Sequence, residues 1–394
     1  MTRKLEIGIS GCGIGGLALG AQMAEAGHSV RLFDQFDAPA PVGSGLVVQP
    51  VGLLVLQALG AAESALGKGK KINTMYGEEA SSGKVALNVS YGADFGLAIH
   101  RAALFDALLG VAQKAGCEIV SSTRIASIQK NSFVTEAGEV LGPFDVLVDA
   151  SGARSPLTPL KAKPLVYGAL WASVDWPKTT LLPQNRLTQH YHRASKMAGI
   201  LPIGCLPGQT TEQAAIFWSI RASDYARWRA QPIEQWKAEV AAFWPDFAPF
   251  LASITSHDDF TLAKYKHGTL KRKTNNRLAF IGDAAHCASP QLGQGANMAL
   301  LDAYALGRFL QTLPVADALL RYENSRRRHI MSYQAMSRVL TPLYQSDSRV
   351  LPWLRNHVLA PLGVWPFSGL LTRVGSGNLI TPIRGVDLAK EPVL

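Results

Sequence analysis

Residues 5–34 read LEIGISGCGIGGLALGAQMAEAGHSVRLFD, and this stretch decides the fold class. Alternating apolar residues over 5–9 predict a strand, residues 17–26 favour a helix that Gly27 ends, and a second strand is expected over 30–33. The order strand, glycine-rich turn, helix, strand predicts the βαβ unit that opens a Rossmann-like α/β domain.

The turn between the first strand and the helix has the spacing GxGxxG. We expect Gly11 to make the tight turn, Gly13 to let a pyrophosphate approach the backbone, and Gly16 to allow close packing of helix on strand. Asp34 lies 21 positions after Gly13, where a carboxylate accepts hydrogen bonds from an adenosine ribose. The candidate nucleotide-binding residues here are Gly11, Gly13, Ile14, Gly15, Gly16 and Asp34.

The composition is that of a globular chain, because 47% of the 394 residues are hydrophobic and only 17% are charged. The net charge of +10 attracts anions of any kind, but the basic runs are short and lack interleaved aromatics, so we expect no nucleic-acid partner. The four cysteines form no CxxC pair, which argues against a disulfide framework or a metal site and favours a reducing, cytoplasmic location. No apolar run is long enough for an integral membrane segment.

Farther along, the chain changes character twice. Long β-type runs separated by Pro, Gly and Asn turns fill residues 166–223 and indicate an antiparallel sheet inserted into the α/β domain. A helix is expected within 233–250, α/β character returns at 278–281 with a helix over 295–312, and residues 325–394 are helical and loop-rich. The predicted fold class is therefore α/β, with an inserted antiparallel β-sheet domain and a helical C-terminus.

A second cluster reads LAFIGDAAH at 278–286, followed by Pro290 and by GQGAN at 293–297. At this point the chain resembles the class A flavin-dependent monooxygenases, the group of para-hydroxybenzoate hydroxylase and salicylate hydroxylase, whose second fingerprint is GD, a proline and a GxGxN helix start. The resemblance covers roughly the first 330 residues. It implies FAD as the tightly held cofactor. It also implies NADH or NADPH as a transient electron donor, in keeping with the lack of a second GxGxxG motif.

The resemblance also implies how the second cluster holds the flavin. Asp283 is expected to contact the ribityl chain, and the loop containing Gly293, Gly295, Ala296 and Asn297 is expected to place backbone N–H groups beside the flavin pyrimidine. A helix N-terminus there has a physical reason, since it stabilises the negative charge that reduced flavin gains.

Two further matches to the family are weaker. Arg101 begins an R-x-x-L helix start, which implies a position at the FAD phosphates. In the family's DG motif this chain has Ser151 where the family has Asp. That departure removes the carboxylate that the family places between the FAD and nicotinamide sites, and leaves Asp149 as a candidate for a related role.

The resemblance and the composition shifts together give domain boundaries. We expect a discontinuous FAD-binding domain over 1–75, 97–165 and 265–335, a substrate domain over 76–96 and 166–264, and a C-terminal helical region over 336–394.

In the resembled reaction, reduced FAD and O2 form a C4a-hydroperoxide that hydroxylates an electron-rich ring, usually a phenol. A base or polar relay beside the ring would help, and His190, Tyr191 and His192 lie on an expected strand with Tyr191 on one face and both histidines on the other. The alternative is that both histidines lie on the surface. Candidates for an apolar pocket wall are Trp171, Met197, Phe217, Trp218 and Pro290, although aromatics at strand spacing are also typical of a core.

Three other functions stay open at this stage. A flavin-dependent halogenase would carry a WxWxIP segment, which Trp171 and Trp176 do not make. The apolar tail at 351–371 leaves room for a flavin reductase or dehydrogenase with an isoprenoid or quinone-like substrate, or for peripheral membrane contact. A flavin-binding protein without turnover is the third. The expected partners are a small-molecule substrate and O2, and the chain is expected to act as a monomer or homodimer.

Overall fold

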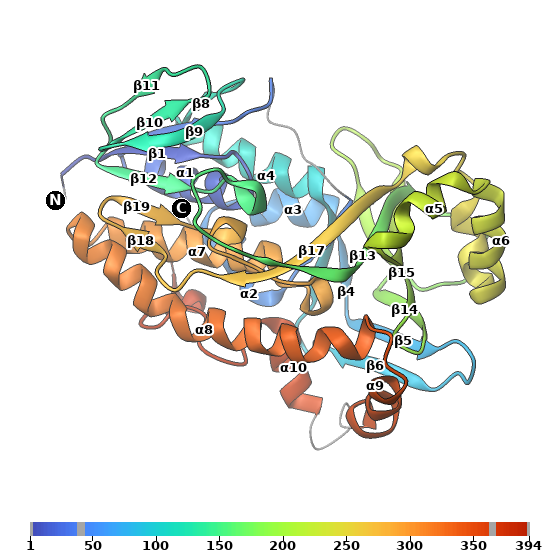
Figure 1. The fold of residues 1–394 in the computed structure, drawn as a ribbon. Helices are drawn as coiled ribbons and strands as arrows, with labels where there is room; N and C mark the ends of the chain where they lie inside the picture. The colour runs from blue at the N-terminus through green and yellow to red at the C-terminus, as the bar shows by residue number, and fades with distance from the viewer. Residues whose placement is uncertain (1–2, 38–43, 362–367, 392–394) are drawn as a thin grey trace.

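The computed structural model describes residues 3–37, 44–361 and 368–391 (Figure 1). One sheet has six strands in the order β18-β19-β12-β1-β2-β8. Its strands are β1 (Glu6–Ser10), β2 (Ser29–Phe33), β8 (Glu118–Val120), β12 (Val146–Asp149), β18 (Thr274–Asn275) and β19 (Leu278–Phe280). All neighbouring strands are parallel except β18 and β19. The carboxyl ends of β1, β2, β12 and β19 therefore meet at one edge, and the predicted Rossmann-like arrangement is confirmed.

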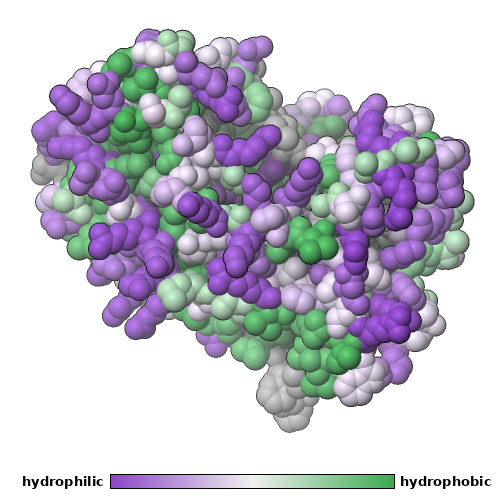
Figure 2. Space-filling view, viewed as in Figure 1, coloured by the Kyte–Doolittle hydropathy of each residue, from purple (hydrophilic) through white to green (hydrophobic). Residues whose placement is uncertain are grey.

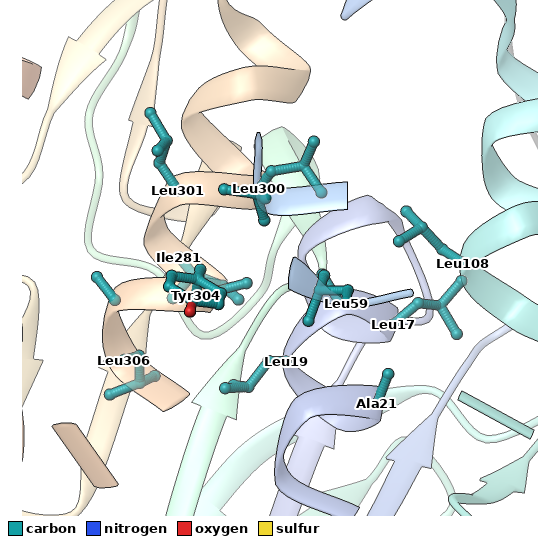
Figure 3. Packing of buried hydrophobic residues seen from close by; sticks show 14 of the residues in the cluster. Leu17, Leu19, Ala21, Leu59, Leu108, Ile281, Leu300, Leu301, Tyr304 and Leu306 are labelled. Carbon is teal, nitrogen blue, oxygen red and sulfur yellow. The ribbon is translucent and has the colours of Figure 1, made fainter. Parts of the chain in front are cut away.

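Five helices accompany this sheet: α1 (Ile14–Glu25), α2 (Pro50–Ala58), α3 (Ala62–Lys68), α4 (Arg101–Lys114) and α7 (Gly295–Leu310). Figure 3 shows α1 lying between α4 and α7, with Leu17 turned toward Leu108 of α4 and Leu19 toward α7. Because α1 packs on two sides, it is apolar nearly all round, and residues 15–23 are all buried. This packing fixes the amino end of α1 against the sheet edge.

The inserted sheet has eight strands in the order β20-β17-β13-β16-β15-β14-β5-β6. Its strands are β5 (Thr74–Glu79), β6 (Val85–Ser90), β13 (Lys163–Asp175), β14 (Arg186–His192), β15 (Lys196–Cys205), β16 (Glu212–Arg221), β17 (Thr261–Thr269) and β20 (His286–Cys287). The predicted antiparallel pairing holds except between β5 and β14, which are parallel. That pair joins a hairpin from the first part of the chain to strands that follow much later.

The two faces of this sheet have different neighbours. The outer face is covered by α5 (Tyr225–Ala230), α6 (Ile233–Phe243) and the 3-10 helix Pro245–Leu251, which pack a cluster of Trp and Phe side chains against it. The inner face is turned toward α8 (Val315–Tyr344), whose Ser337 Oγ lies 3.1 Å from His267 Nε2 of β17. Alternation along each strand therefore decides which side chains meet α6 and which meet α8.

Two small sheets complete the strand structure. They consist of β3 (Gly45–Val48), β7 (Gly96–His100) and β4 (Lys70–Ile72), and of β9 (Ile125–Gln129), β10 (Ser132–Thr135) and β11 (Val140–Leu141). Gly45 of β3 packs so tightly on Ile203 and Ala215 of the large sheet that a methyl group there would overlap them. The first small sheet therefore fastens the large sheet to the six-stranded domain.

The C-terminal region consists of α8, α9 (Val350–Leu354), the π-helix Arg355–Leu359 and α10 (Ser368–Ser376). Two elements run across boundaries expected from the sequence: β17 crosses 264/265 and α8 crosses 335/336 without interruption. The expected apolar tail at 351–371 lies partly outside the described residues. In the described ranges no helix combines the length and apolar character that crossing a membrane requires.

Candidate functional site

The glycine-rich turn has the geometry that its spacing predicts. Gly11 has φ +103°, and a methyl group there would lie 2.7 Å from the carbonyl oxygen of Ala150. A methyl group at Gly16 would overlap the carbonyl oxygen of Gly11. Both positions therefore require glycine for the fold itself, because no side chain fits.

Gly13 is different, and its difference points to a ligand. Its φ of −79° and ψ of −172° suit any residue, it is exposed, and a methyl group there would meet nothing within 4 Å. The fold alone gives no reason for glycine at this position. Gly13 is the N-cap residue of α1 and supplies no side chain to satisfy the first N–H groups of the helix. A phosphate on this open helix end would satisfy them.

Asp34, at the end of β2, lies beside the same turn. Its Oδ2 accepts a hydrogen bond from the Cys12 backbone N–H at 2.9 Å, and its Oδ1 accepts one from the Phe36 N–H at 3.0 Å. The side chain is only half-buried. Each carboxylate oxygen keeps accepting capacity, so Asp34 can also bind a ribose hydroxyl.

The second cluster forms another open helix end at the same sheet edge. Gly282, Asp283 and Ala284 form a 3-10 turn after β19, and α7 begins at Gly295 with no side-chain cap. Gly295 is exposed, and a methyl group there would meet nothing within 4 Å. As at Gly13, the protein leaves a helix N-terminus uncapped beside open space, which suits a group carrying negative charge.

Asp283 has no hydrogen-bond partner among the described residues and its side chain is exposed. Desolvation by the surrounding protein raises the pKa of its carboxyl group, while electrostatic interaction with His286 and Arg101 opposes this rise. The carboxylate is therefore accessible and can accept a hydrogen bond from a hydroxyl group of a ligand.

The two loops lie side by side. A methyl group at Gly15 would lie 3.3 Å from the Ile281 side chain and 3.5 Å from the carbonyl oxygen of Ala299. Arg101, at the start of α4, acts electrostatically on Asp283. The site therefore has two uncapped helix ends, with Asp34 beside that of α1 and Asp283 beside that of α7. This arrangement fits a dinucleotide with a phosphate bridge and a polar linker, which is the chemistry of FAD.

Asp149 does not take over the role of the missing DG aspartate. It is fully buried, and its carboxylate accepts hydrogen bonds from the hydroxyls of Ser151 and Ser155, each at 2.5 Å, and from the Ser151 N–H at 3.1 Å. These bonds hold the loop after β12. The proposed role of Asp149 toward the nicotinamide is therefore wrong, because its oxygens point into the protein.

Sequence reasoning missed Gln49, which is fully buried between β3 and the second loop. Its backbone N–H donates to Asn297 Oδ1 at 2.8 Å, and its Oε1 accepts from the Tyr91 hydroxyl at 2.6 Å. Asn297 also donates to the carbonyl oxygens of Val47 and Gly293. The side chain of Asn297 thus fixes the loop, so only its backbone remains for the cofactor. Gln49 Nε2 has no partner in the described chain.

A second missed feature is a buried charge network directly behind Asp283. Asp302 of α7 is fully buried and accepts hydrogen bonds from the Gly282 N–H at 3.0 Å, His286 Nε2 at 2.6 Å and Arg326 Nε at 2.8 Å. Because these positive partners surround it, the pKa of Asp302 lies well below its usual range despite the desolvation. Asp302 therefore holds the Gly282 turn in place. The sequence did contain a signal for this network, because Asp302 is an acidic residue among the apolar residues of a predicted helix.

The network ends at His329, whose tautomer follows from its neighbours. The Arg326 guanidinium only donates, so His329 Nδ1, 3.2 Å away, must accept, and His329 Nε2 donates to the carbonyl oxygen of Gly377 at 2.9 Å. Burial, reinforced by the charge of Arg326, lowers the pKa of His329 to about 3. A proton on Nδ1 would break the contact with Arg326.

We therefore expect the protein to lose stability as the pH falls below 6.5. The unfolded chain takes up a proton on His329 near that pH, while the folded chain does so only near pH 3. The loss is about 1.4 kcal/mol per pH unit, or roughly 2 kcal/mol at pH 5. Urea unfolding at pH 7 and pH 5 measures it. His329→Gln keeps an acceptor and a donor, and should remove that part of the pH dependence; an unchanged dependence would contradict the assignment.

The candidate pocket residues divide between the two faces of the large sheet. Trp171, Met197 and Phe217 lie on the inner face, where the Trp171 and Phe217 rings are 4.6 Å apart. Trp218 points the opposite way and packs on Trp236 of α6 in the outer cluster. The inclusion of Trp218 in the pocket is therefore wrong, because neighbouring residues of a strand face opposite sides. Pro290 is exposed at the start of the 3-10 turn Pro290–Leu292.

The expected base or relay on β14 is corrected in the same way. His190 lies on the outer face, where its ring stacks on Trp244 at 4.2 Å, and His192 shares that face and lies 3.9 Å from Glu79. Tyr191 is on the inner face but is buried, and its hydroxyl donates to Gln189 Oε1 at 2.9 Å. None of the three is placed to take a proton from a ring on the inner face.

Tyr265 of β17, and not a residue of β14, presents a free hydroxyl donor on the inner face. Trp171 Nε1–H donates to the Tyr265 hydroxyl oxygen at 2.9 Å. Because indole can only donate, the hydroxyl proton of Tyr265 stays available, and no described residue accepts it. Tyr265 and Tyr344 keep accessible surface although desolvation raises the pKa of both hydroxyls. Both side chains are therefore only partly covered on the inner face.

The comparisons with known proteins agree with this geometry. The model of a family described as FAD binding domain matches residues 4–337. The chain belongs to this family. A hispidin-3-hydroxylase from Neonothopanus nambi is 27% identical, over 78% of this chain and 80% of the relative. A putative 2-heptyl-3-hydroxy-4(1H)-quinolone synthase from Rhodococcus erythropolis is 26% identical, over 84% of this chain and 86% of the relative.

Among solved structures, that of Klebsiella pneumoniae HpxO complexed with FAD and uric acid superposes with a TM-score of 0.78. The match covers 95% of this chain and 98% of that chain at 19% identity. The expectation of a class A FAD-dependent monooxygenase is thus confirmed, and FAD is the cofactor. The alternative of a flavin-binding protein without turnover is set aside for this member of the FAD-binding domain family.

Proposed function

We propose that this protein hydroxylates a small, uncharged aromatic molecule whose ring carries a hydroxyl or oxo oxygen, with O2 and NADH or NADPH as co-substrates. The observation that carries the substrate class is the free hydroxyl donor of Tyr265 beside the apolar ring of Trp171. An aromatic wall with one neutral donor favours a planar ligand with one acceptor oxygen.

The charge on the inner face supports an uncharged ligand. Arg355 is the cation beneath this wall, with its guanidinium 4.7 Å from the Tyr191 ring and 5.3 Å from the Tyr344 ring. It is fully buried and bonded to Glu79 Oε2 at 3.0 Å, so its charge is already neutralised. A substrate carboxylate would therefore compete with Glu79 for Arg355 instead of meeting a free cation at this position.

The proposed reaction assigns a role to the cofactor, to the two helix ends and to the aromatic wall. When bound, FAD supplies the redox chemistry, accepting a hydride from the nicotinamide and activating O2. The uncapped ends of α1 and α7 bind the phosphates and the flavin pyrimidine, and Asp34 and Asp283 accept hydrogen bonds from the sugar and ribityl hydroxyls. Tyr265 orients the ring by donating to its oxygen, and the aromatic wall excludes water.

Nicotinamide consumption and oxygen uptake by the purified yellow protein test the function. A panel of phenols and hydroxylated or oxo heterocycles should include compounds that stimulate both, and mass spectrometry after reaction under ¹⁸O₂ should find one labelled atom in the product. Product formation without O2 would instead indicate a reductase. If no uncharged compound of the panel stimulates consumption and carboxylated phenols do so instead, the uncharged substrate class is contradicted.

Tyr265→Phe is expected to raise the substrate KM by about tenfold, the value of one neutral hydrogen bond in an enclosed site. The flavin content should stay normal, because the hydroxyl lies outside the cofactor loops. Steady-state kinetics and flavin absorbance measure both effects. Tyr225→Phe on α5 is the matched control and should match the wild type. An unchanged KM in Tyr265→Phe would remove Tyr265 from substrate binding.

We also infer a reducing compartment such as the cytoplasm, because the described cysteines are all free thiols. The choices between monomer and homodimer and between NADH and NADPH stay predictions. Sedimentation velocity and the ratio of kcat/KM for the two nucleotides decide them.

A further inference from the structure

The C-terminal part of the chain is strongly basic. Residues 327–376 contain six arginines, no lysine and one acidic residue, Asp347. Asp347 is already paired with Arg221 and accepts a hydrogen bond from Tyr167 at 2.7 Å. The exposed arginines of this stretch are Arg327, Arg328, Arg338, Arg349 and Arg373, and none of them forms an ion pair with a described residue. About half of the net charge of +10 therefore lies here without compensation.

The same stretch exposes large apolar side chains. Of the thirteen large hydrophobic side chains that the described residues expose, six fall between 331 and 370. They are Met331 and Val339 on α8, Val350 and Trp353 on α9, Val358 on the π-helix and Leu370 on α10. Val350 is 71% exposed and Trp353 58%. Leaving a tryptophan this accessible is costly for a surface that meets only water.

These side chains belong to adjoining elements. The Tyr333 hydroxyl of α8 donates to the Val374 carbonyl oxygen of α10 at 3.0 Å, and Trp353 stacks on His357 with ring centres 5.1 Å apart. In Figure 1, α10 lies below the middle of α8 and α9 lies near the carboxyl end of α8, and Figure 2 shows an apolar patch at this lower edge of the molecule. We call the five exposed arginines and six exposed apolar side chains named above the basic apolar surface.

A second copy of the chain is a poor partner for this surface. A twofold interface brings the same patch of each copy together, so uncompensated arginines would face arginines at close range. An anionic bilayer is complementary to both components. Acidic headgroups attract exposed arginines, tryptophan favours the depth of the headgroups, and aliphatic side chains gain by entering the acyl region.

We propose that this protein docks peripherally on anionic membranes through the basic apolar surface of α8, α9 and α10. None of the eleven side chains of this surface belongs to the cofactor loops, although α10 contacts the second loop where Gln294 Nε2 donates to the Gly375 carbonyl oxygen at 3.1 Å. Binding by short apolar side chains and a few arginines is reversible and depends on salt.

Vesicle flotation of the full, flavin-loaded chain tests the proposal. We expect the yellow protein to float with vesicles of phosphatidylcholine and phosphatidylglycerol, to be released by high salt, and to bind pure phosphatidylcholine vesicles at least about tenfold more weakly. Equal binding to both kinds of vesicle, or none to either, would overturn the proposal.

Two variants separate the components. One double variant, Arg338→Glu with Arg349→Glu, reverses charge, and the other, Val350→Ser with Trp353→Ser, removes apolar side chains. Each should weaken binding to anionic vesicles by about tenfold or more. Matched controls on the loop between β13 and β14 are Lys178→Glu and Leu181→Ser, which should bind like the wild type. Flavin absorbance without vesicles verifies that each variant is folded. If the surface variants abolish a concentration-dependent dimer while vesicle binding is unaffected, the surface joins two copies and the membrane proposal fails.

Discussion

Gly13→Val is expected to give a folded protein that purifies without its yellow colour. The backbone at Gly13 is extended, with φ −79°, and the space around a side chain there is open, so valine meets no protein atom within 4 Å. Its cost to the fold is about 1 kcal/mol as a poorer N-cap residue. The valine methyl groups would instead occupy the place where a phosphate must approach the first N–H groups of α1, and we expect FAD affinity to fall by at least about 100-fold.

The ratio of the absorbance of the flavin bands to that of the protein band measures flavin content, and the thermal unfolding transition measures stability. Gly110→Val is the matched control, because Gly110 on α4 also has nothing within 4 Å of a methyl group and is not at a positive φ. Gly16→Ala gives the opposite result, a failure to fold, since its methyl group would overlap the Gly11 carbonyl oxygen. Full flavin content in Gly13→Val would show that the cofactor does not lie on this helix end.

Arg326→Met is expected to be the most destabilising single change in the buried network, with a loss of about 3–5 kcal/mol in the free energy of unfolding. Methionine fills a similar volume but leaves Asp302 without its donor at 2.8 Å and the Pro382 carbonyl oxygen without its partner. The carboxylate stays buried with only His286 and the Gly282 N–H as partners. Because Asp302 also holds the Gly282 N–H, the turn that carries Asp283 should loosen and FAD should dissociate faster.

Urea unfolding and the rate of flavin release measure these two effects. The neighbouring exposed Arg328→Met is the control and should change stability by less than about 0.5 kcal/mol. Adding Asp302→Asn to Arg326→Met should cost less than the sum of the single changes, because both disrupt one network. Additive losses would show that the two side chains act independently.

The cofactor half of this protein was largely predictable from local sequence. The turn at Gly11 and the close approach at Gly16 follow from spacing, because a strand followed immediately by a helix leaves one geometry for the connecting residues. The second loop was found from the GD and GxGxN residues by resemblance. The spacing also assigned different roles to Gly13 and Gly16, and the structure adds the physical difference: a methyl group would meet open space at Gly13 and the Gly11 carbonyl oxygen at Gly16.

The substrate half could not be predicted in the same way. Alternation correctly separated Tyr191 from His190 and His192, but the sequence could not show that the histidine face is the one that α6 covers. Trp218 and Phe217 are equally apolar neighbours, and only the position of α6 decides between them. The Asp302 network joins residues of α7, α8 and the chain near Pro382, which no local pattern relates.

The sequence by itself determined the βαβ unit, the two cofactor loops and the inserted sheet, because each depends on residues close together in the chain that constrain one another through backbone geometry. Only the tertiary structure decided which sheet face α6 covers, that Tyr265 keeps a free proton, and that exposed apolar and basic side chains lie on the adjoining elements α8, α9 and α10. Those properties depend on contacts between segments that are far apart in the chain. Tertiary packing decides which side chains meet there, and the spacing of residues along the sequence does not.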